Sequence, residues 1–292
     1  MSAIIASEMS RRRPMTDPDL PSVAAVYICF MMPFDLHHTT AVIPGASPGL
    51  GAEFATQLAR RGADVVLVAR REDRLRELAD LIHAEHGVTA TPVALDLTEP
   101  HAAAELRRVL EARGISIQTL VNNAGFGMKG NFAEADPARL ASMLQLNVAA
   151  VVALTREFLP DLQRDGRGAL INVASTAASQ PCPNMALYGA TKAFVLSFTE
   201  AIAYETRHSD LRVLCVSPGA TRTEFFDVVG TEDAAVGRFQ SPEQVVSLAF
   251  NALDRRTVPV SVVAGRLNAF TAKVAGLAPR RATLALTGRL LA

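Results

Sequence analysis

Three side chains with complementary acid–base properties occur near the middle of the chain: Ser175, Tyr188 and Lys192. Tyr188 and Lys192 are four residues apart, so on a helix they share one face, one turn apart. Ser175 follows an apolar run, 169–174, that is typical of a buried strand. A phenol, an ammonium and a hydroxyl can therefore converge at the carboxyl end of a sheet, where open α/β folds bind their ligands.

The phenol of Tyr188 is the candidate proton donor and acceptor. A free tyrosine titrates near ~10, which is too high for easy proton exchange at neutral pH. An ammonium about 5 Å away, at an effective dielectric constant near 20, favours the phenolate by roughly 3 kcal/mol. We therefore expect Lys192 to lower the pKa of Tyr188 by about two units, into a working range. The alternative is a core tyrosine beside an exposed lysine, which is the better interpretation of a Tyr-x-x-x-Lys pattern standing alone.

A glycine-rich segment, Gly45-Ala-Ser-Pro-Gly49-Leu-Gly51, lies between an expected strand over 40–43 and an expected helix. Gly45 permits a tight turn, Gly49 lets the backbone approach a pyrophosphate, and Gly51 lets the helix pack closely on the strand. The amides at the helix start would face the phosphates. The segment predicts a nucleotide-binding loop. A plain turn is the alternative, because the glycine spacing differs from the common dinucleotide pattern.

The end of the second expected strand, 65–68, indicates which nicotinamide nucleotide fits. NAD-binding units usually carry an acidic residue there, whereas this chain has Ala69-Arg70-Arg71. Guanidinium groups suit a phosphate dianion, so NADP(H) is favoured over NAD(H). The alternative is a basic start to a solvated helix. Asp96, after the third strand, could accept from the adenine amino group or cap the next helix.

Apolar and amphipathic stretches alternate along the chain. We expect strands over 40–43, 65–68, 88–95, 117–121, 169–174, 213–216 and 258–263, with helices between them and a long amphipathic helix over 137–164. This alternation implies a parallel sheet with right-handed crossovers, and therefore a single α/β domain over 40–265.

Composition excludes several classes of protein. The 29 basic and 29 acidic residues balance, which argues against a nucleic-acid-binding protein. The three cysteines and six histidines show no disulfide or metal-ligand spacing, so we expect no metal and a reducing, cytoplasmic location. Residues 1–39 are interpreted as a disordered leader or a mis-called start. The apolar run 22–34 is too short to span a bilayer and resembles a signal peptide only in outline.

The motifs together resemble those of the short-chain dehydrogenase/reductase family. The features that carry the resemblance are the glycine loop, Asp96, Asn122-Asn-Ala-Gly125, Asn147, Ser175, Tyr188 with Lys192, and Pro218-Gly219, in this order. The resemblance implies a doubly wound, seven-stranded Rossmann-type sheet with helices on both faces, and NAD(P)-dependent oxidoreduction. It also implies that Tyr188 is the acid/base, that Lys192 lowers its pKa and holds the nicotinamide ribose, that Ser175 orients the carbonyl, and that Asn147 supports a water-linked proton relay.

The resemblance also implies a set of cofactor-binding residues. They are Gly45, Ser47, Gly49, Leu50, Gly51, Arg70, Arg71, Asp96, Leu97, Asn123, Ala124, Gly125, Tyr188, Lys192, Pro218, Gly219 and Thr221. The stretch 69–75 is similar to that of NADPH-preferring members. Two prolines depart from the family pattern: Pro44 replaces the usual threonine, and Pro48 stands where NADP-preferring members often carry a basic residue. Because Pro48 carries no charge at that position, phosphate recognition shifts to Arg70 and Arg71. Proline also has no amide, so it removes a hydrogen-bond donor from the loop.

The substrate pocket should be built from Phe126, segment 177–187 and the loop after Gly219, and should be apolar. Thr221 or Thr223 could donate to the nicotinamide carboxamide or cap the loop. The leading hypothesis is an NADP(H)-dependent reductase or dehydrogenase acting on a small-molecule ketone, aldehyde or alcohol, working as a homodimer or homotetramer. The alternative is a catalytically silent NADP(H)-binding sensor or scaffold.

The C-terminal tail, 266–292, is basic and amphipathic. From residue 255 onward the sequence holds seven basic residues and no acidic one, with Leu267, Phe270, Val274 and Leu277 at helix-like spacing. Such a segment can lie on an anionic membrane as a peripheral contact, and a lipid-handling reductase would then be a further alternative. The other interpretation is a helix packed on the domain or on a partner subunit.

Overall fold

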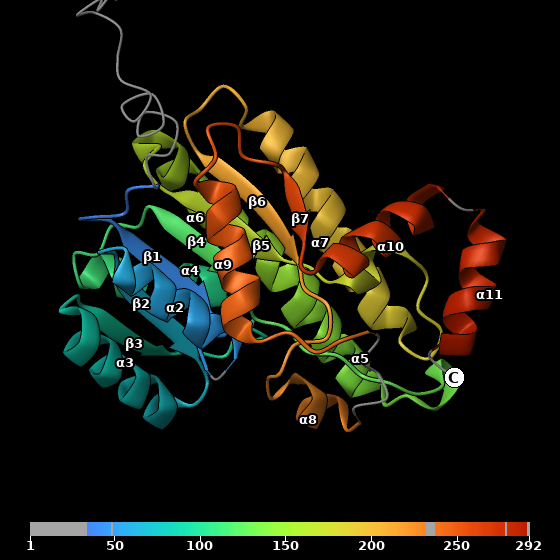
Figure 1. Ribbon diagram of the computed structural model, residues 1–292. Coiled ribbons are helices and arrows are strands. Elements are labelled where there is room, and N and C mark those ends of the chain that lie inside the picture. The colour runs from blue at the N-terminus through green and yellow to red at the C-terminus, as the bar shows by residue number, and fades with distance from the viewer. Residues whose placement is uncertain (1–33, 48, 232–236, 278, 291–292) are drawn as a thin grey trace, which may run out of the picture. The chain divides into compact units, whose positions relative to one another are not determined.

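Parallel strands form the centre of the computed structural model, which describes residues 34–47, 49–231, 237–277 and 279–290 (Figure 1). The strands are β1 (Thr40–Pro44), β2 (Asp64–Ala69), β3 (Ala90–Ala94), β4 (Thr119–Asn122), β5 (Ala169–Val173), β6 (Arg212–Ser217) and β7 (Ser261–Val263). Their order in the sheet is β3-β2-β1-β4-β5-β6-β7, and every neighbouring pair is parallel. The predicted seven-stranded parallel sheet is confirmed, and its strand order reverses between β1 and β4. The expectations for residues 1–33 and for Pro48 lie outside the described residues.

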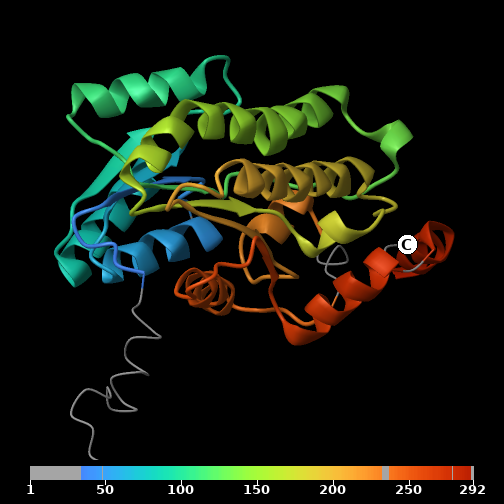
Figure 2. The same ribbon diagram turned by 90° about the horizontal axis from the view of Figure 1, so that it is seen from above.

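Helices cover both faces of this sheet. They are α2 (Leu50–Arg60), α3 (Glu72–His86), α4 (Ala102–Ala112), α5 (Pro137–Leu144), α6 (Ala150–Asp165), α7 (Ala186–Glu205), α8 (Phe225–Val229), α9 (Pro242–Leu253), α10 (Arg266–Leu277) and α11 (Arg280–Leu290). Short helical turns are η1 (Phe132–Glu134), η2 (Gln145–Ala149) and η3 (Thr176–Ser179). Helices α4, α6 and α7 lie on one side of the sheet and α2, α3 and α9 on the other (Figures 1 and 2).

Strand β2 illustrates why the sequence forms this core. Val65 and Leu67 pack into the cluster formed with α2, α3 and α9, whereas Val66 and Val68 pack into the cluster formed with α4 and α6. A strand buried on both faces needs apolar residues at every position, so its sequence does not alternate. At the far edge, β7 is only Ser261–Val263 and pairs with β6, so the strand expected over 258–263 is shorter than predicted.

The long helix expected over 137–164 is present, but α5 and α6 are joined by the π-helical turn η2. The stretch Pro137–Asp165 is, among the described residues, long and apolar enough to cross a membrane. Its side chains Leu154, Phe158 and Leu162 are buried in the core beside the sheet. We therefore interpret the apolar character of this helix as that of a core helix.

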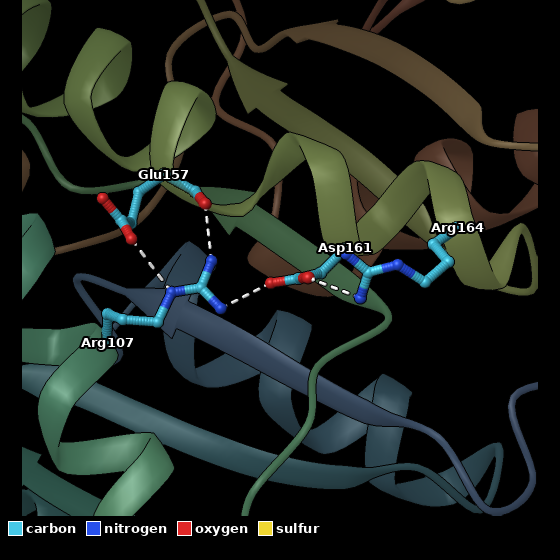
Figure 3. A network of polar contacts seen from close by, with 4 residues as sticks. All are labelled: Arg107, Glu157, Asp161 and Arg164. Carbon is cyan, nitrogen blue, oxygen red and sulfur yellow. Dashed lines mark hydrogen bonds and ion pairs between the residues drawn. The ribbon is translucent and has the colours of Figure 1, made fainter.

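An ion-pair network ties α4 to α6 (Figure 3). The guanidinium of Arg107 donates from Nε to Glu157, at 2.9 Å, and also pairs with Asp161. Arg164 reaches the other oxygen of Asp161 at 3.0 Å, and the guanidinium of Arg107 lies 4.6 Å above the ring of Phe158. The network fixes α4 on α6. Helix α6 directly follows the turn η2, which carries the candidate site residue Asn147.

The C-terminal tail forms two helices. Helix α10 lies against β7 and η3, and α11 buries Thr287 and approaches Pro183. Leu267 and Phe270 are 67% and 65% exposed, and Val274 is also exposed. The apolar face predicted for the tail is therefore present at Leu267, Phe270 and Val274, and the part of the chain that the structure describes leaves it exposed.

Candidate active site

Tyr188 and Lys192 lie on the face of α7 that packs toward the sheet, one turn apart, and both are buried. The hydroxyl of Ser175, two residues after the end of β5, accepts from the amide of Ala177 at 3.1 Å and lies within hydrogen-bonding reach of the hydroxyl of Tyr188. The Nζ of Lys192 donates to the carbonyl oxygen of Val173 at 2.8 Å and lies 5.9 Å from the centroid of the Tyr188 ring. The three side chains therefore converge at the carboxyl end of the sheet, as the sequence predicts.

The electrostatics of the pair differ from the expectation in one respect. Burial raises the pKa of Tyr188 to about 12, against the opposing effect of the hydrogen bond from Ser175. Burial also lowers the pKa of Lys192 to about 8. The expected lowering of the tyrosine pKa by the lysine was wrong for this structure, because loss of water around the buried phenolate dominates and Ser175, rather than Lys192, is the group that opposes it.

Asn147 projects from the π-helical turn η2 and joins three segments. Its Nδ2 donates to the carbonyl of Phe126 at 2.9 Å and to Oγ1 of Thr191 at 3.1 Å. Its Oδ1 accepts from the amide of Phe126 at 3.0 Å. A π-helical turn is wider than an α-helical one and often marks a functional site. Thr191 was missed from the sequence, although its position three residues after Tyr188 places it on the same helix face.

The glycine loop has the backbone that a phosphate-binding turn requires. Gly45 and Gly49 have φ of 75° and 111°, which favours glycine. A Cβ on Gly45 would come 2.8 Å from the Cα of Ala124, and a Cβ on Gly51 would overlap the carbonyl oxygen of Gly45. Asn123 donates from Nδ2 to the carbonyl of Gly45 at 2.9 Å, which ties β4 to the loop. This close approach explains the small residues at both segments.

The N-terminus of α2 is suited to an anion. The residue before it, Gly49, provides no side chain to cap the helix, and Ser47 and Leu50 flank the turn half-buried. The first amides of a helix without a side-chain cap can donate to phosphate oxygens. The residues present therefore fit the pyrophosphate of a dinucleotide.

The residues after β2 form a basic corner, defined here as Arg70, Arg71 and Arg74. Arg70 is 77% exposed and its Nη1 lies 4.0 Å from Asp96. Arg71 and Arg74 donate to the two carboxylate oxygens of Glu224, at 3.1 and 2.6 Å. Arg74 and Glu224 were missed from the sequence, because their pairing joins segments far apart along the chain.

Asp96 makes the capping interaction that was one of its two expected roles, and it also faces Arg70. Its Oδ1 accepts from the amide and hydroxyl of Thr98, at 2.9 and 2.7 Å, which is the turn-capping alternative. Although partial burial opposes ionisation, these hydrogen bonds hold the pKa of Asp96 below its usual value. Its Oδ2 faces Arg70, and the next residue, Leu97, is buried in the core.

The end of β4 brings a backbone segment against the candidate acid–base residues. A Cβ on Gly125 would come 3.0 Å from Oδ1 of Asn147 and 3.4 Å from Nζ of Lys192. Ala124 is half-buried and packs toward the core. Glycine at this position therefore lets the strand end lie beside Asn147 and Lys192.

The segment after β6 returns over the glycine loop. Thr221 follows Pro218 and Gly219, is buried, and donates from Oγ1 to the carbonyl of Gly219 at 3.0 Å. Thr223 lies so close to the glycine loop that a Cβ on Gly49 would be 3.0 Å from its side chain. Its hydroxyl accepts from the amide of Phe225 at 3.3 Å. In this structure both threonines stabilise the segment itself, which is the loop-capping alternative.

An apolar wall surrounds the ring of Tyr188. The rings of Phe225 and Tyr188 are 5.4 Å apart. The other residues of this cluster are Phe126, Met128, Met143, Ala177, Cys182, Met185 and Leu187. Burial raises the pKa of the Cys182 thiol to about 11, so it remains a neutral, apolar neighbour. Met128 and Met143 were not predicted, because they come from the segments before and within α5.

A separate cavity of about 600 Å³ lies on the opposite face of α7. Gly189, Ala190 and Ala193 line it, together with Arg280 and Leu284 of α11. At 3.6 residues per turn these helix positions point away from Tyr188 and Lys192. The remaining lining comes from segment 177–187, which was predicted to build the substrate pocket: Ala178, Ser179, Gln180, Pro181, Cys182, Pro183 and Ala186. The cavity therefore shares this part of the predicted lining, whereas Phe126 and the loop after Gly219 do not line it.

Comparisons with known proteins agree with the geometry. The chain matches the family model described as short chain dehydrogenase over residues 39–234. It is 30% identical over 251 residues to the 7beta-hydroxysteroid dehydrogenase of Clostridium sardiniense, covering 85% of this chain and 94% of that protein.

Solved structures give the same result. A short-chain dehydrogenase from Sphingobium yanoikuyae in complex with NADPH is 34% identical, with a TM-score of 0.71 over 82% of this chain and 94% of that one. L-sorbose reductase from Gluconobacter frateurii, complexed with NADPH and L-sorbose, is 30% identical, with a TM-score of 0.70 over 81% of this chain and 99% of that one. With a matching sheet and matching sequence motifs, this chain belongs to the short chain dehydrogenase family of oxidoreductases.

Proposed function

We propose that this protein interconverts a ketone or aldehyde and the corresponding alcohol, with NADP(H) as cofactor. The observation that carries the proposal is the pairing of the half-buried hydroxyl of Ser175 with the hydroxyl of the buried Tyr188, at the carboxyl edge of the sheet and beside an apolar wall. A hydroxyl pair in such a place can hold a carbonyl oxygen and exchange a proton with it. A catalytically silent sensor would not require this pair, and the comparisons do not favour that alternative.

Each side chain has a distinct part in the proposed reaction. When bound, the nicotinamide ring supplies the hydride in reduction and accepts it in oxidation. Tyr188 gives its proton to the carbonyl oxygen in reduction and takes it back in oxidation, and Ser175 donates a hydrogen bond to that oxygen. The buried phenolate left behind is costly, so a charged Lys192 nearby favours the transfer. With a pKa of about 8, Lys192 is mostly charged at neutral pH.

Asn147 acts on the reaction through the segments that it joins. Its hydrogen bonds hold Phe126, which belongs to the apolar wall, and Thr191, which belongs to the helix of Tyr188. Both Nδ2 donors are engaged by these partners, whereas Oδ1 has a further lone pair for a water. The proton relay implied by the family resemblance would therefore use this oxygen.

A preference for NADP(H) is supported by the basic corner and by the NADPH-containing neighbours. Arg70 presents an exposed guanidinium at the end of β2, and Arg71 follows it. Replacing both arginines with alanine should weaken NADPH binding by about 10–100-fold and NADH binding by less than about threefold. Fluorescence titration with both reduced nucleotides measures this. Equal losses for the two nucleotides would contradict the phosphate assignment.

The class of substrate is inferred from the lining of the site. Phe126, Met143, Met185 and Phe225 present apolar surfaces around Tyr188, which favours an apolar ketone or secondary alcohol. The test is a panel of aliphatic, cyclic and aromatic ketones, with polyhydroxylated ketones as the matched polar set. Oxidation of NADPH should be faster with the apolar set. Faster turnover of the polar set would overturn the assignment, and no turnover of any carbonyl would contradict the proposed reaction.

Assembly and location remain predictions. We expect a homodimer or homotetramer in the cytoplasm, which gel filtration with light scattering can test for the oligomeric state. Helix α10 has an exposed apolar face with basic residues beside it. The two candidate partners for this face are a second subunit and an anionic membrane. The comparisons give no support to membrane contact. Co-sedimentation with anionic vesicles, lost on removal of residues 267–292, would be needed to establish it.

A further inference from the structure

Glu224 joins the segment after β6 to the start of α3. Each of its carboxylate oxygens accepts a hydrogen bond from a different arginine: Oε2 from Arg71 at 3.1 Å and Oε1 from Arg74 at 2.6 Å. These hydrogen bonds, that from Arg74 first, hold the pKa of Glu224 below its usual value, so the group is anionic at neutral pH. An anion thus already occupies part of the basic corner.

The residues on either side of Glu224 reach the rest of the site. Thr223 lies against Gly49 in the glycine loop, and Phe225 packs on Tyr188 with ring centroids 5.4 Å apart. The position of Glu224 is therefore set from both sides by contacts with the site. Arg74 is not among the proposed phosphate ligands. Its hydrogen bond to Glu224 can therefore persist when Arg71 binds a phosphate.

Arg71 has two prospective anionic partners. One is Glu224, and the other is the 2′-phosphate that distinguishes NADP(H) from NAD(H) under the proposed function. Arg70, at 4.0 Å from Asp96 and 77% exposed, has no such close carboxylate partner among the described residues. A phosphate dianion bound by Arg70 and Arg71 would therefore share Arg71 with a carboxylate and experience its repulsion.

We propose that Glu224 is a specificity-determining residue for the cofactor: its carboxylate competes with the 2′-phosphate of NADP(H) for Arg71 and so moderates the preference for NADP(H) over NAD(H). This inference rests on the proposed function. NAD(H) carries a hydroxyl at that position and does not compete. The ratio of the two dissociation constants, Kd for NADH over Kd for NADPH, therefore measures the competition between the carboxylate and the 2′-phosphate. Any effect of the substitution that is common to both nucleotides cancels in this ratio.

The first test is Glu224→Gln, which keeps the shape and removes the charge. We expect the ratio of Kd for NADH to Kd for NADPH, measured by nucleotide fluorescence at low salt, to rise about five- to tenfold. The matched control is Glu72→Gln. Glu72 is the first residue of α3, the helix that contains Arg74, and its carboxylate pairs with Arg76 at 2.6 Å. That variant loses the same charge nearby and should change the ratio less than about twofold.

The second test is Arg74→Gln. With Arg74 gone, Glu224 depends on Arg71 alone, so the competition strengthens and the ratio should fall. Adding Glu224→Gln to Arg74→Gln should restore the ratio to that of Glu224→Gln. A ratio unchanged in Glu224→Gln, or equal losses of both nucleotides, overturns the inference and leaves Glu224 as an anchor of the segment. If the wild-type protein binds neither nucleotide, the proposed function itself fails, which is a separate result.

Discussion

Lys192 donates a hydrogen bond from Nζ to the carbonyl oxygen of Val173, 2.8 Å away, and so joins α7 to the end of β5. This bond orients the ammonium from the side of the sheet, and Tyr188 lies one turn earlier on the same helix. A neutral carbonyl compensates a buried cation only in part, which is why burial lowers the pKa of Lys192 to about 8. The lysine is therefore held in place by a bond that does not depend on Tyr188.

The lowered pKa of Lys192 predicts a specific dependence of stability on pH. Its ordinary value is 10.5, and burial brings it to about 8 in the folded state. Between these values the unfolded chain binds more protons than the folded chain, so the contribution of this group to the free energy of unfolding rises with pH. Relative to Lys192→Met, the wild-type protein should gain about 2–3 kcal/mol between pH 7.5 and 10.

Urea unfolding of both proteins across this range measures the gain. Lys273→Met, which removes an exposed lysine from α10, is the control and should show no such gain. The series stops at pH 10 because the pKa of Tyr188, raised to about 12, makes stability fall as pH rises from about 10 to 12. A difference between wild type and Lys192→Met that does not vary with pH would contradict the burial of a titrating ammonium.

Tyr188→Phe tests the proposed acid directly. The variant keeps the ring that packs on Phe225 and removes only the hydroxyl that pairs with Ser175. We expect turnover of a responsive ketone to fall about 10²–10⁴-fold, with the dissociation constant for NADPH changed less than about threefold. Steady-state rates and nucleotide titration give both numbers. Retained turnover would eliminate Tyr188 as the proton donor.

Asn147→Ala should destabilise the fold as well as the site. The substitution leaves the half-buried amide and carbonyl of Phe126 without their partner, and it removes the donor to Oγ1 of Thr191, which still donates to the carbonyl of Tyr188 at 2.8 Å. We expect a loss of about 2–4 kcal/mol in the free energy of unfolding, measured with urea. Asn131→Ala is the control, because Asn131 caps the exposed turn η1 and should cost less than about 1.5 kcal/mol. Similar costs at both sites would show that Asn147 does not join the segments as described.

Gly45→Ala separates crowding from backbone strain. Gly45 and Gly87 have similar left-handed backbones, with φ of 75° and 69°, but only at Gly45 would a Cβ meet close neighbours. Alanine should cost about 1–2 kcal/mol at either site through its backbone conformation. Only Gly45→Ala should also weaken NADPH binding, by more than about tenfold, because it pushes the loop away from Ala124. An equal effect of Gly87→Ala on NADPH binding would refute a local role of the glycine loop.

Much of the fold could be predicted because its signals are local. The unbroken apolar run of β2 indicates a strand buried on both faces, and the Tyr188–Lys192 spacing places two side chains on one helix face. The pairing of Glu224 with Arg71 and Arg74 could not be predicted, since about 150 residues separate the partners and either charge alone is typical of a solvated surface. The pKa of Tyr188 was predicted in the wrong direction because the sequence shows the neighbouring charge but not the degree of burial.

The π-helical turn η2 makes this stretch sensitive to changes in length. Each residue of an α-helix turns the chain by about 100°, so a single deletion within Gln145–Ala149 would restore regular winding and swing either Asn147 or the buried face of α6 out of register. Substitutions here can be absorbed one at a time, but a one-residue shortening cannot. Insertions and deletions during the divergence of this chain should therefore have been tolerated in its surface connections and rejected at this turn.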